Sequence, residues 1–274
     1  MENLVASALL EDVGHEDITT NSVVGADLRC RARLFAKQEG VLSGMLPFKT
    51  AFEVMRAELG DWSSLEDGAS FGKGGLVASF TGKTRAVLTA ERTAMNFVQH
   101  LSGVATLTRR FADALQGLDC RVCGTRKTTP MLRQLEKSAI VHGGGATHRH
   151  TLFDGVLIKE NHVMAAGGIG EAVRRARHHA HHLMRVEVEV RDLDELEQAL
   201  ASEADVIMLD NMDNELMAEA VRRARGRRVI LEASGNASLD RVRGMAETGV
   251  QFVSVGALTH SAPSVDLTLL IENS

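Results

Sequence analysis

The sequence predicts an α/β protein whose larger, C-terminal part is a βα barrel or a parallel sheet. Beyond residue 118, apolar runs of strand length alternate with helical stretches, and such near-continuous runs are typical of strands buried on both faces. The expected strands are 155–158, 184–190, 205–209, 228–231 and 250–255, and the expected helices lie near 130–141, 168–183, 192–202, 213–225 and 238–248. This alternation favours a βα barrel, either complete or short of eight strands.

The N-terminal part follows a different pattern, which predicts a modest α+β layer. The expected elements are strands 31–37 and 75–81, a helix over 47–59, and two helices between 85 and 115. The two strands alternate apolar and polar residues, as half-buried antiparallel strands do. Pro47 suits the first turn of its helix and Gly60 its end, and we expect Gly103 to separate the two later helices.

Composition excludes several classes of protein. The chain of 274 residues carries a net charge of −5 and only ten aromatic residues, so it lacks the basic surface and stacking platforms of a nucleic-acid-binding protein. No apolar run approaches the length of a membrane span. Three cysteines do not suggest a disulfide framework, and Cys120 and Cys123 are expected in a buried strand. The first residues lack a secretory signal, so we expect a cytoplasmic protein.

Polar residues gather where the expected strands end, and in a βα barrel this is the face that carries reactive groups. They are Lys159, Glu160, Asn161 and His162 after the first strand, Glu187 and Glu189 on the second, Asp210 and Asn211 after the third, Glu232, Ser234 and Gly235 after the fourth, and Gly256 after the fifth. Any one of them could be a loop residue or a helix cap. Together, at five strand ends, they indicate a site.

Residues 121–162 form a basic segment in an acidic protein. Seven Lys or Arg face three acids there, a balance of +4 that indicates a site for an anionic small molecule. Arg133 and Lys137 are expected on a solvated helix face. The remaining candidates are Arg126, Lys127, His148, Arg149 and Lys159. Arginine suits carboxylates because its planar fork binds both oxygens, and lysine suits phosphate as a compact charge.

Acidic residues and glycine turns complete the expected site. Glu189 and Asp210 could hold a hard divalent cation or accept hydrogen bonds from sugar hydroxyls. The turns at Ser234-Gly235 and 255–257 could present backbone N–H groups to a phosphate. Cations facing acids and phosphate-binding turns fit a phosphoribosyl donor with Mg²⁺. Neither a Rossmann glycine motif nor a P-loop motif occurs in the sequence.

Three motifs carry a family resemblance: GTRKTTP at 124–130, GGG at 143–145 followed by His148-Arg149, and DGVLIKENH at 154–162. With them, nearly the whole chain resembles the quinolinate phosphoribosyltransferases, also called carboxylating nicotinate-nucleotide pyrophosphorylases. The resemblance implies an N-terminal α/β sandwich over 1–105, joined by segment 262–274, and an incomplete parallel α/β barrel over 106–261. It also implies a homodimer, or a higher assembly of dimers, in which one subunit completes the site of the other.

The resemblance also implies a role for each candidate residue. Arg126, His148 and Arg149 would bind the two carboxylates of quinolinate, and Arg92 would reach in from the other subunit. Lys127 and Lys159 would serve the pyrophosphate and the reacting centre, with Thr125 beside them. Glu189 and Asp210 would contact ribose and Mg²⁺. The 5′-phosphate would be surrounded by Ser234, Gly235, Gly256 and His260. Lys127, Lys159, Glu189 and Asp210 are the expected catalytic residues.

The implied reaction transfers a phosphoribosyl group from phosphoribosyl pyrophosphate to quinolinate with loss of CO₂, giving nicotinate mononucleotide and pyrophosphate in NAD biosynthesis. The sequence departs from the family pattern at Met131, Thr147, Thr151 and Glu160, where Gly, Asn, Gly and Asp are usual. Two alternatives stay open. The chain could be a divergent paralogue that acts on another aromatic acid, or a noncatalytic anion-binding protein.

Overall fold

The chain forms two compact units in the computed structural model, which describes residues 1–273. The first unit comprises Met1–Arg109, Thr129–Gly144 and the C-terminal segment from Ser261, and the second comprises Arg110–Thr128 and Gly145–His260. Residues 129–144, which the sequence placed with the barrel, thus belong to the first unit by their contacts.

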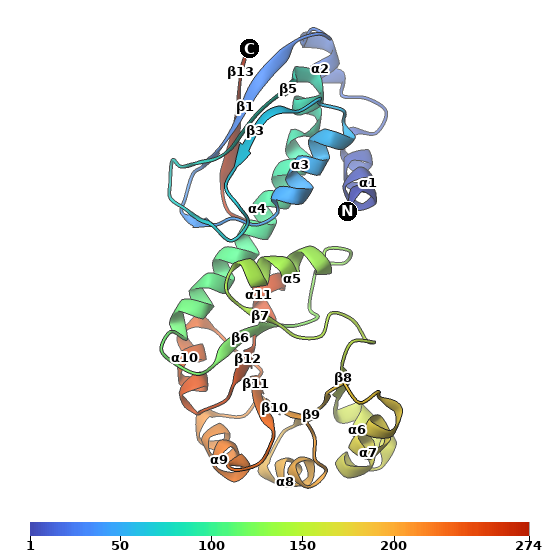
Figure 1. The fold of residues 1–274 in the computed structure, drawn as a ribbon, viewed down its shortest axis with the longest axis vertical. Helices are drawn as coiled ribbons and strands as arrows, with labels where there is room; N and C mark the ends of the chain where they lie inside the picture. The colour runs from blue at the N-terminus through green and yellow to red at the C-terminus, as the bar shows by residue number, and fades with distance from the viewer. Residues whose placement is uncertain (274) are drawn as a thin grey trace. The chain divides into compact units, whose positions relative to one another are not determined.

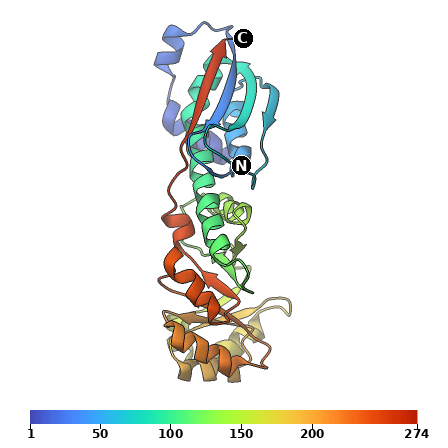
Figure 2. The same cartoon turned by 90° about the vertical axis from the view of Figure 1, so that its left-hand side faces the viewer.

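The first unit is built on a four-stranded antiparallel sheet with the order β13-β1-β5-β3. Its strands are β1 (Arg29–Ala36), β3 (Gly60–Ser64), β5 (Leu76–Lys83) and β13 (Leu267–Asn273). The C-terminal strand β13 runs beside β1 from Cys30↔Asn273 to Ala36↔Leu267 (Figure 2). Every second residue of β1 is buried, as the alternating sequence pattern predicted.

Aromatic side chains join the helix α3 (Met45–Val54) to this sheet. Phe52 of α3 lies 4.8 Å from Phe80 of β5, measured between ring centroids, and Phe48 lies 5.0 Å from Phe52. Phe48, Phe52 and Phe80 are fully buried. Burying rings of this size supplies much of the stability of a small core.

Helix α4 (Thr84–Ala114) is continuous, so the prediction that Gly103 separates two helices is wrong. Gly103 is needed for packing: a Cβ atom there would lie 2.2 Å from the carbonyl oxygen of Pro263. The glycine therefore admits the backbone of the C-terminal segment against the helix. A glycine inside a helix costs about 1 kcal/mol and is tolerated when packing requires it.

The remaining elements of the first unit are α1 (Glu2–Val13), α2 (Ile18–Val23), β2 (Gly40–Val41), β4 (Ser70–Phe71) and α5 (Arg133–His142). The expected solvated face of α5 is wrong, because Lys137 is only 1% exposed and Glu136 is fully buried. Glu136 accepts hydrogen bonds from the His100 ring at 2.8 Å and from the Thr129 backbone N–H at 3.0 Å. These partners replace the water that a buried carboxylate loses.

The second unit contains a seven-stranded parallel sheet with the order β7-β6-β12-β11-β10-β9-β8. The strands are β6 (Arg121–Gly124), β7 (Ala146–Thr147), β8 (Val156–Ile158), β9 (Val186–Val190), β10 (Val206–Asp210), β11 (Ile230–Ser234) and β12 (Phe252–Ser254). Among the described residues no pairing joins β7 to β8, so the sheet is an incomplete α/β barrel, as predicted.

Helices follow the strands and lie along the outside of this curved sheet (Figure 1). They are α6 (Glu160–Ala166), α7 (Ile169–His179), α8 (Leu193–Ala201), α9 (Asn214–Ala224) and α10 (Leu239–Glu247). The short helix α11 (Ala257–His260) lies instead at the C-terminal end of β12. Asp192 and Asp213 cap the N-termini of α8 and α9 with their side chains. Within the described chain, no helix is long and apolar enough to cross a membrane.

Strand β11 differs from its prediction in a way that matters for the site. The sequence placed Glu232 and Ser234 after the strand, but β11 begins at Ile230 and includes both residues. Because side chains alternate along a strand, Leu231 and Ala233 share one face while Glu232 and Ser234 share the other. Glu232 is therefore a buried strand residue, only 4% exposed.

Candidate active site

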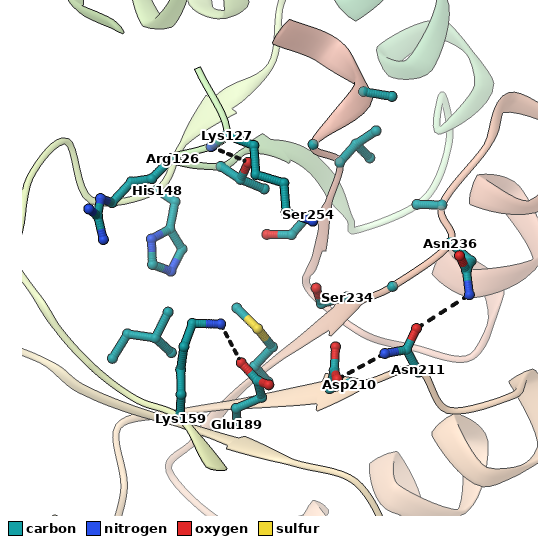
Figure 3. Close-up of a pocket in the computed structure, with 18 of the residues that line it drawn as sticks. Arg126, Lys127, His148, Lys159, Glu189, Asp210, Asn211, Ser234, Asn236 and Ser254 are labelled. Atoms are coloured by element: carbon teal, nitrogen blue, oxygen red, sulfur yellow. Dashed lines mark hydrogen bonds and ion pairs between the residues drawn. The ribbon is translucent and has the colours of Figure 1, made fainter. Parts of the chain in front are cut away.

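A cavity of about 660 Å³ opens at the C-terminal ends of the parallel strands (Figure 3). It is lined by twelve of the residues that the sequence singled out: Thr125, Arg126, Lys127, His148, Arg149, Lys159, Glu189, Asp210, Ser234, Gly235, Gly256 and His260. The parallel arrangement explains this gathering, because every strand of such a sheet ends at the same edge.

Of the residues to which the sequence assigned a binding or catalytic role, Arg92 is the one outside the described lining of the cavity. The strand-end residues that were noted without a role and also lie outside that lining are Glu160, Asn161, His162, Glu187 and Glu232. Arg92 is exposed on α4, in the first unit. The expectation that Arg92 acts on the site of a second subunit stays a prediction.

The loop after β6 carries Thr125, Arg126 and Lys127 along one wall of the cavity. The Lys127 backbone N–H donates to Thr125 Oγ1 at 3.0 Å, and the Thr259 hydroxyl donates to the Lys127 carbonyl at 2.7 Å. These bonds fix the loop backbone on both sides of Lys127, whose side chain remains exposed. Figure 3 shows Arg126 and His148 on the same side of the cavity as Lys127.

Arg149 lies close to a second guanidinium. Its Nη1 donates to the Gly155 carbonyl at 3.0 Å, which fixes its position. Burial, and next the positive charge of Arg126, lower the pKa of Arg149. Two guanidinium groups held close together and partly shielded from water bind an anion strongly, because the anion offsets the repulsion between their positive charges. This wall suits a ligand with more than one carboxylate.

His148 is held from behind by an acid. Its Nε2 lies 2.6 Å from Glu187 Oε2, and the two side chains are only 13% and 7% exposed. A hydrogen bond of this length to a carboxylate is strong and fixes the orientation of the imidazole ring.

The opposite wall begins with a lysine and a carboxylate in contact. Lys159 Nζ lies 2.7 Å from Glu189 Oε2, and Glu189 is the more buried of the two side chains (Figure 3). Lys159 also precedes α6, where its backbone N–H donates to His162 Nδ1 at 2.9 Å. This bond gives His162 of the DGVLIKENH motif a structural role at the start of the helix.

Glu189 and Asp210 provide the oxygen ligands that a hard divalent cation requires. They lie near the ends of the adjacent strands β9 and β10, and both line the cavity. Asn211 Nδ2 donates to Asp210 Oδ2 at 2.9 Å, which leaves the other carboxylate oxygen available to a ligand. Carboxylates without nitrogen or sulfur ligands fit Mg²⁺, which usually keeps waters and binds substrate phosphates as well.

The turn after β11 brings backbone close to the cavity. Gly235 has a φ of +99°, and a Cβ atom there would lie 2.2 Å from Asn211 Oδ1. Only glycine fits both the backbone conformation and the space. After the neighbouring strand β12, Gly256 leads into α11 beside the ring of His260. Both turns lie where the sequence placed a phosphate.

Several residues near the site had no predicted role. Asn236 and Ser254 line the cavity and were not singled out in the sequence. Glu187 and Glu232 were counted among the polar strand-end residues without a role of their own, and both are buried and outside the described lining of the cavity. The signal for the two acids was visible, since each interrupts an otherwise apolar strand sequence. An acid in a strand buried on both faces needs a partner, and that partner cannot be identified before the strands are placed in order.

Comparison with known proteins matches both parts of the chain to one family. The model of the quinolinate phosphoribosyl transferase N-terminal domain matches residues 17–102, and that of the C-terminal domain matches residues 104–270. The chain belongs to the quinolinate phosphoribosyltransferase family. A probable carboxylating nicotinate-nucleotide pyrophosphorylase from Bacillus subtilis is 38% identical over 98% of this chain and 92% of its own length.

Solved structures of the family have the same fold. The crystal structure of NadC from Streptococcus pyogenes matches with a TM-score of 0.95 and 38% identity, covering 100% of this chain and 96% of that one. The nicotinate-nucleotide pyrophosphorylase from Francisella tularensis matches with a TM-score of 0.94 and 38% identity, covering 99% and 95% of the two chains. The sandwich and incomplete barrel are therefore those of the family.

The four departures from the family pattern lie outside the described lining of the main cavity. Thr151 donates to Asp154 through its backbone and its hydroxyl, at 2.7 and 2.8 Å, and so shapes the loop after His150. Thr147 ends β7, and Glu160 pairs with Arg191 at 2.7 Å. Met131 has a φ of +67°, a conformation that favours the glycine usual in the family.

Proposed function

We propose that this chain transfers a phosphoribosyl group from phosphoribosyl pyrophosphate to quinolinate and releases CO₂, as a carboxylating nicotinate-nucleotide pyrophosphorylase. Membership of the family supports this activity. The observation that carries it is the composition of one cavity, where basic side chains from β6, β7 and β8 face carboxylates from β9 and β10.

Quinolinate binds to the basic wall. Arg126 and Arg149 pair with its two carboxylates, and His148 donates to one of them. Burial and the charge of Arg126 destabilise the Arg149 cation in the free protein, so a bound dianion gains from both guanidiniums. These groups orient the ring nitrogen towards the ribose, which is the main contribution a protein makes to a reaction between two bound molecules.

Phosphoribosyl pyrophosphate binds across the other wall. The turns at Gly235 and Gly256 take its 5′-phosphate, Glu189 and Asp210 accept hydrogen bonds from the ribose hydroxyls, and Lys127 and Lys159 approach the pyrophosphate. Glu189 and Asp210 would also hold Mg²⁺, largely through the bound substrate. When bound, this ion neutralises charge that develops on the leaving pyrophosphate.

The reaction needs no nucleophile from the protein. The lone pair of the ring nitrogen forms a bond to ribose C1 while the bond from C1 to pyrophosphate breaks, through a transition state with positive charge on the sugar. Glu189 and Asp210 stabilise that positive charge, and the lysines stabilise the departing anion. The alkylated ring is a pyridinium. When the carboxylate beside the nitrogen departs as CO₂, the electron pair of the broken bond stays on the ring carbon as a carbanion, which the positive nitrogen stabilises and which then takes up a proton.

A homodimer and a cytoplasmic location are further parts of the proposal. The exposed position of Arg92 on α4 is compatible with an action on the site of a second subunit. Sequence composition favours the cytoplasm, because three cysteines, an odd number, suit a reducing compartment better than a disulfide framework.

The test is a coupled assay with quinolinate, phosphoribosyl pyrophosphate and Mg²⁺ that follows nicotinate mononucleotide and CO₂ together. We expect equal amounts of both products, and none when nicotinate replaces quinolinate. Product from a different aromatic acid would replace this proposal with a paralogue of altered specificity. Binding of quinolinate by calorimetry without any product would indicate a noncatalytic anion-binding protein.

A further inference from the structure

We propose that Glu187 is a positioning residue that holds the His148 ring for the incoming substrate, and that Glu232 and Ser254 complete a buried polar chain behind it. This inference rests on the proposed function, because His148 is taken to bind a carboxylate of quinolinate. Glu187 itself belongs to a second cavity, and the described lining of the main cavity does not include it.

Two cavities meet at the His148 ring. The smaller one, of about 230 Å³, is lined by Glu187, Glu232 and the first residues of β10, β11 and β12. His148 and Arg149 line both cavities. The imidazole therefore contributes to the lining of both the main cavity and the smaller one. Figure 3 shows it beside Arg126 in the main cavity.

The contact between Glu187 and His148 determines the direction of the ring. His148 Nε2 and Glu187 Oε2 are 2.6 Å apart, and the His148 backbone N–H donates to the Gly124 carbonyl at 3.3 Å. The backbone hydrogen bond fixes the position of the His148 main chain, and the side-chain hydrogen bond fixes the orientation of the imidazole ring. Together they set the direction of Nδ1, the second nitrogen of the imidazole.

The interior behind Glu187 is buried and polar. Glu187 of β9, Glu232 of β11 and Ser254 of β12 are 6%, 4% and 5% exposed. The Ser254 hydroxyl donates to Glu232, and one ligand atom each of His148, Glu187 and Glu232 lies within 4.8 Å of the others. Strands β11 and β12 are neighbours and β10 separates them from β9, so three strands of one parallel sheet carry the acid that orients the histidine and the two residues behind it.

Glu187 keeps one oxygen free for Glu232. Its Oε1 is buried without a hydrogen-bond partner in the described part of the chain. Burial, and next the negative charge of Glu187, raise the pKa of Glu232. A protonated Glu232 can donate to Glu187, whereas two adjacent buried carboxylates would repel each other.

A metal ion is the other way to join a histidine and two acids, and the distance argues against it. Ligands at about 2.0–2.2 Å around a tetrahedral zinc ion are separated by more than about 3 Å. The 2.6 Å between Nε2 and Oε2 is the length of a hydrogen bond. The geometry points to a shared proton between these two atoms.

The test compares Glu187→Ala and Glu187→Gln with Glu247→Gln, a change of an exposed acid on α10. Loss of a charge-assisted hydrogen bond is expected to raise KM for quinolinate about tenfold or more in Glu187→Ala. Glu187→Gln retains an acceptor for Nε2–H and is expected to recover most of this loss. KM for phosphoribosyl pyrophosphate is expected to stay within about twofold in both.

A second readout follows the histidine directly. In the wild-type protein, nitrogen-15 NMR of labelled histidine is expected to show Nε2 of His148 protonated and Nδ1 dependent on bound quinolinate. In Glu187→Ala, the proton of His148 is expected to lose its preference for Nε2. Ser254→Ala is a milder change, expected to raise KM for quinolinate about two- to fivefold, and it keeps the test valid if Glu187→Ala does not fold.

Either of two results would overturn the inference. One is an equal change in both KM values, which would indicate a general loss of structure. The other is an unaltered His148 spectrum in Glu187→Ala together with an unaltered KM for quinolinate. Absence of product from the wild-type protein would instead refute the proposed function, and the NMR result would still show whether Glu187 orients His148.

Discussion

Lys159 Nζ and Glu189 Oε2 lie 2.7 Å apart on one wall of the cavity, at the ends of the adjacent strands β8 and β9. In the free protein each charge neutralises the other. Half of the lysine side chain is exposed, while the glutamate is 15% exposed. Under the proposed function, we expect substrate binding to break this ion pair, with Lys159 turning to the pyrophosphate and Glu189 to the ribose.

We expect Lys159→Ala to reduce kcat at least tenfold and by up to about a thousandfold, because one positive group at the leaving anion is worth several kcal/mol. Steady-state kinetics with both substrates would measure the loss. Lys73→Ala, a change of an exposed lysine in the first unit, is the matched control and should leave kcat unaltered. A loss smaller than tenfold in Lys159→Ala would exclude Lys159 from the reacting centre.

Arg149→Lys is expected to raise KM for quinolinate about 10- to 100-fold, since lysine keeps the charge but loses the planar fork that holds a carboxylate by two bonds. The KM for phosphoribosyl pyrophosphate should change little. Arg175→Lys on the exposed face of α7 provides the control. Equal effects on both substrates would argue that Arg149 supports the loop at Gly155 and does not bind the acid.

Mixing two inactive variants tests the shared site. If Arg92 serves the other subunit, Arg92→Ala and Lys159→Ala homodimers are both inactive, but a mixed dimer contains one intact site. After random exchange of subunits, roughly a quarter of wild-type activity is expected to return. Activity that stays at the level of the separate variants would place Arg92 outside the site of a second subunit.

Met131→Gly is expected to stabilise the protein by about 0.5–1 kcal/mol, because Met131 has a φ of +67° and its exposed side chain contributes little packing. Denaturant unfolding measures the change. The same replacement at Gln134, an exposed position within α5, should destabilise the protein by a similar amount. If Met131→Gly and Gln134→Gly both lower the free energy of unfolding, the Met131 side chain makes a contact that offsets its backbone strain.

The buried acid Glu232 predicts a dependence of stability on pH. Burial, and next the charge of Glu187, raise its pKa above that of an unfolded glutamate, so the folded chain binds this proton more tightly. The stabilisation is complete below pH 4.5, the usual value, and is lost as pH rises towards the raised pKa. Melting temperatures of the wild type should therefore fall across this range relative to Glu232→Gln. Parallel curves for the two proteins would contradict the shift.

The sequence was sufficient for the parts of this protein that depend on local pattern. Apolar runs identified five of the seven strands of the barrel sheet, β8 to β12, and alternating residues identified β1 and β5. The rule that parallel strands end at one edge placed Lys159, Glu189 and Asp210 at one cavity. Each of these predictions needs only the period of a strand or the direction of a sheet.

Three features depended on neighbours that are distant in the chain. Gly103 looks like a helix end, but it lies within a continuous helix because the backbone at Pro263 packs against it. Lys137 has the spacing of a solvated face and is buried. Glu187 forms a hydrogen bond with His148, which is 39 residues away in the chain. The local sequence pattern indicates whether a segment prefers to form a helix or a strand. Which side chains are buried, and which partners they bond to, is decided only when the strands and helices pack together.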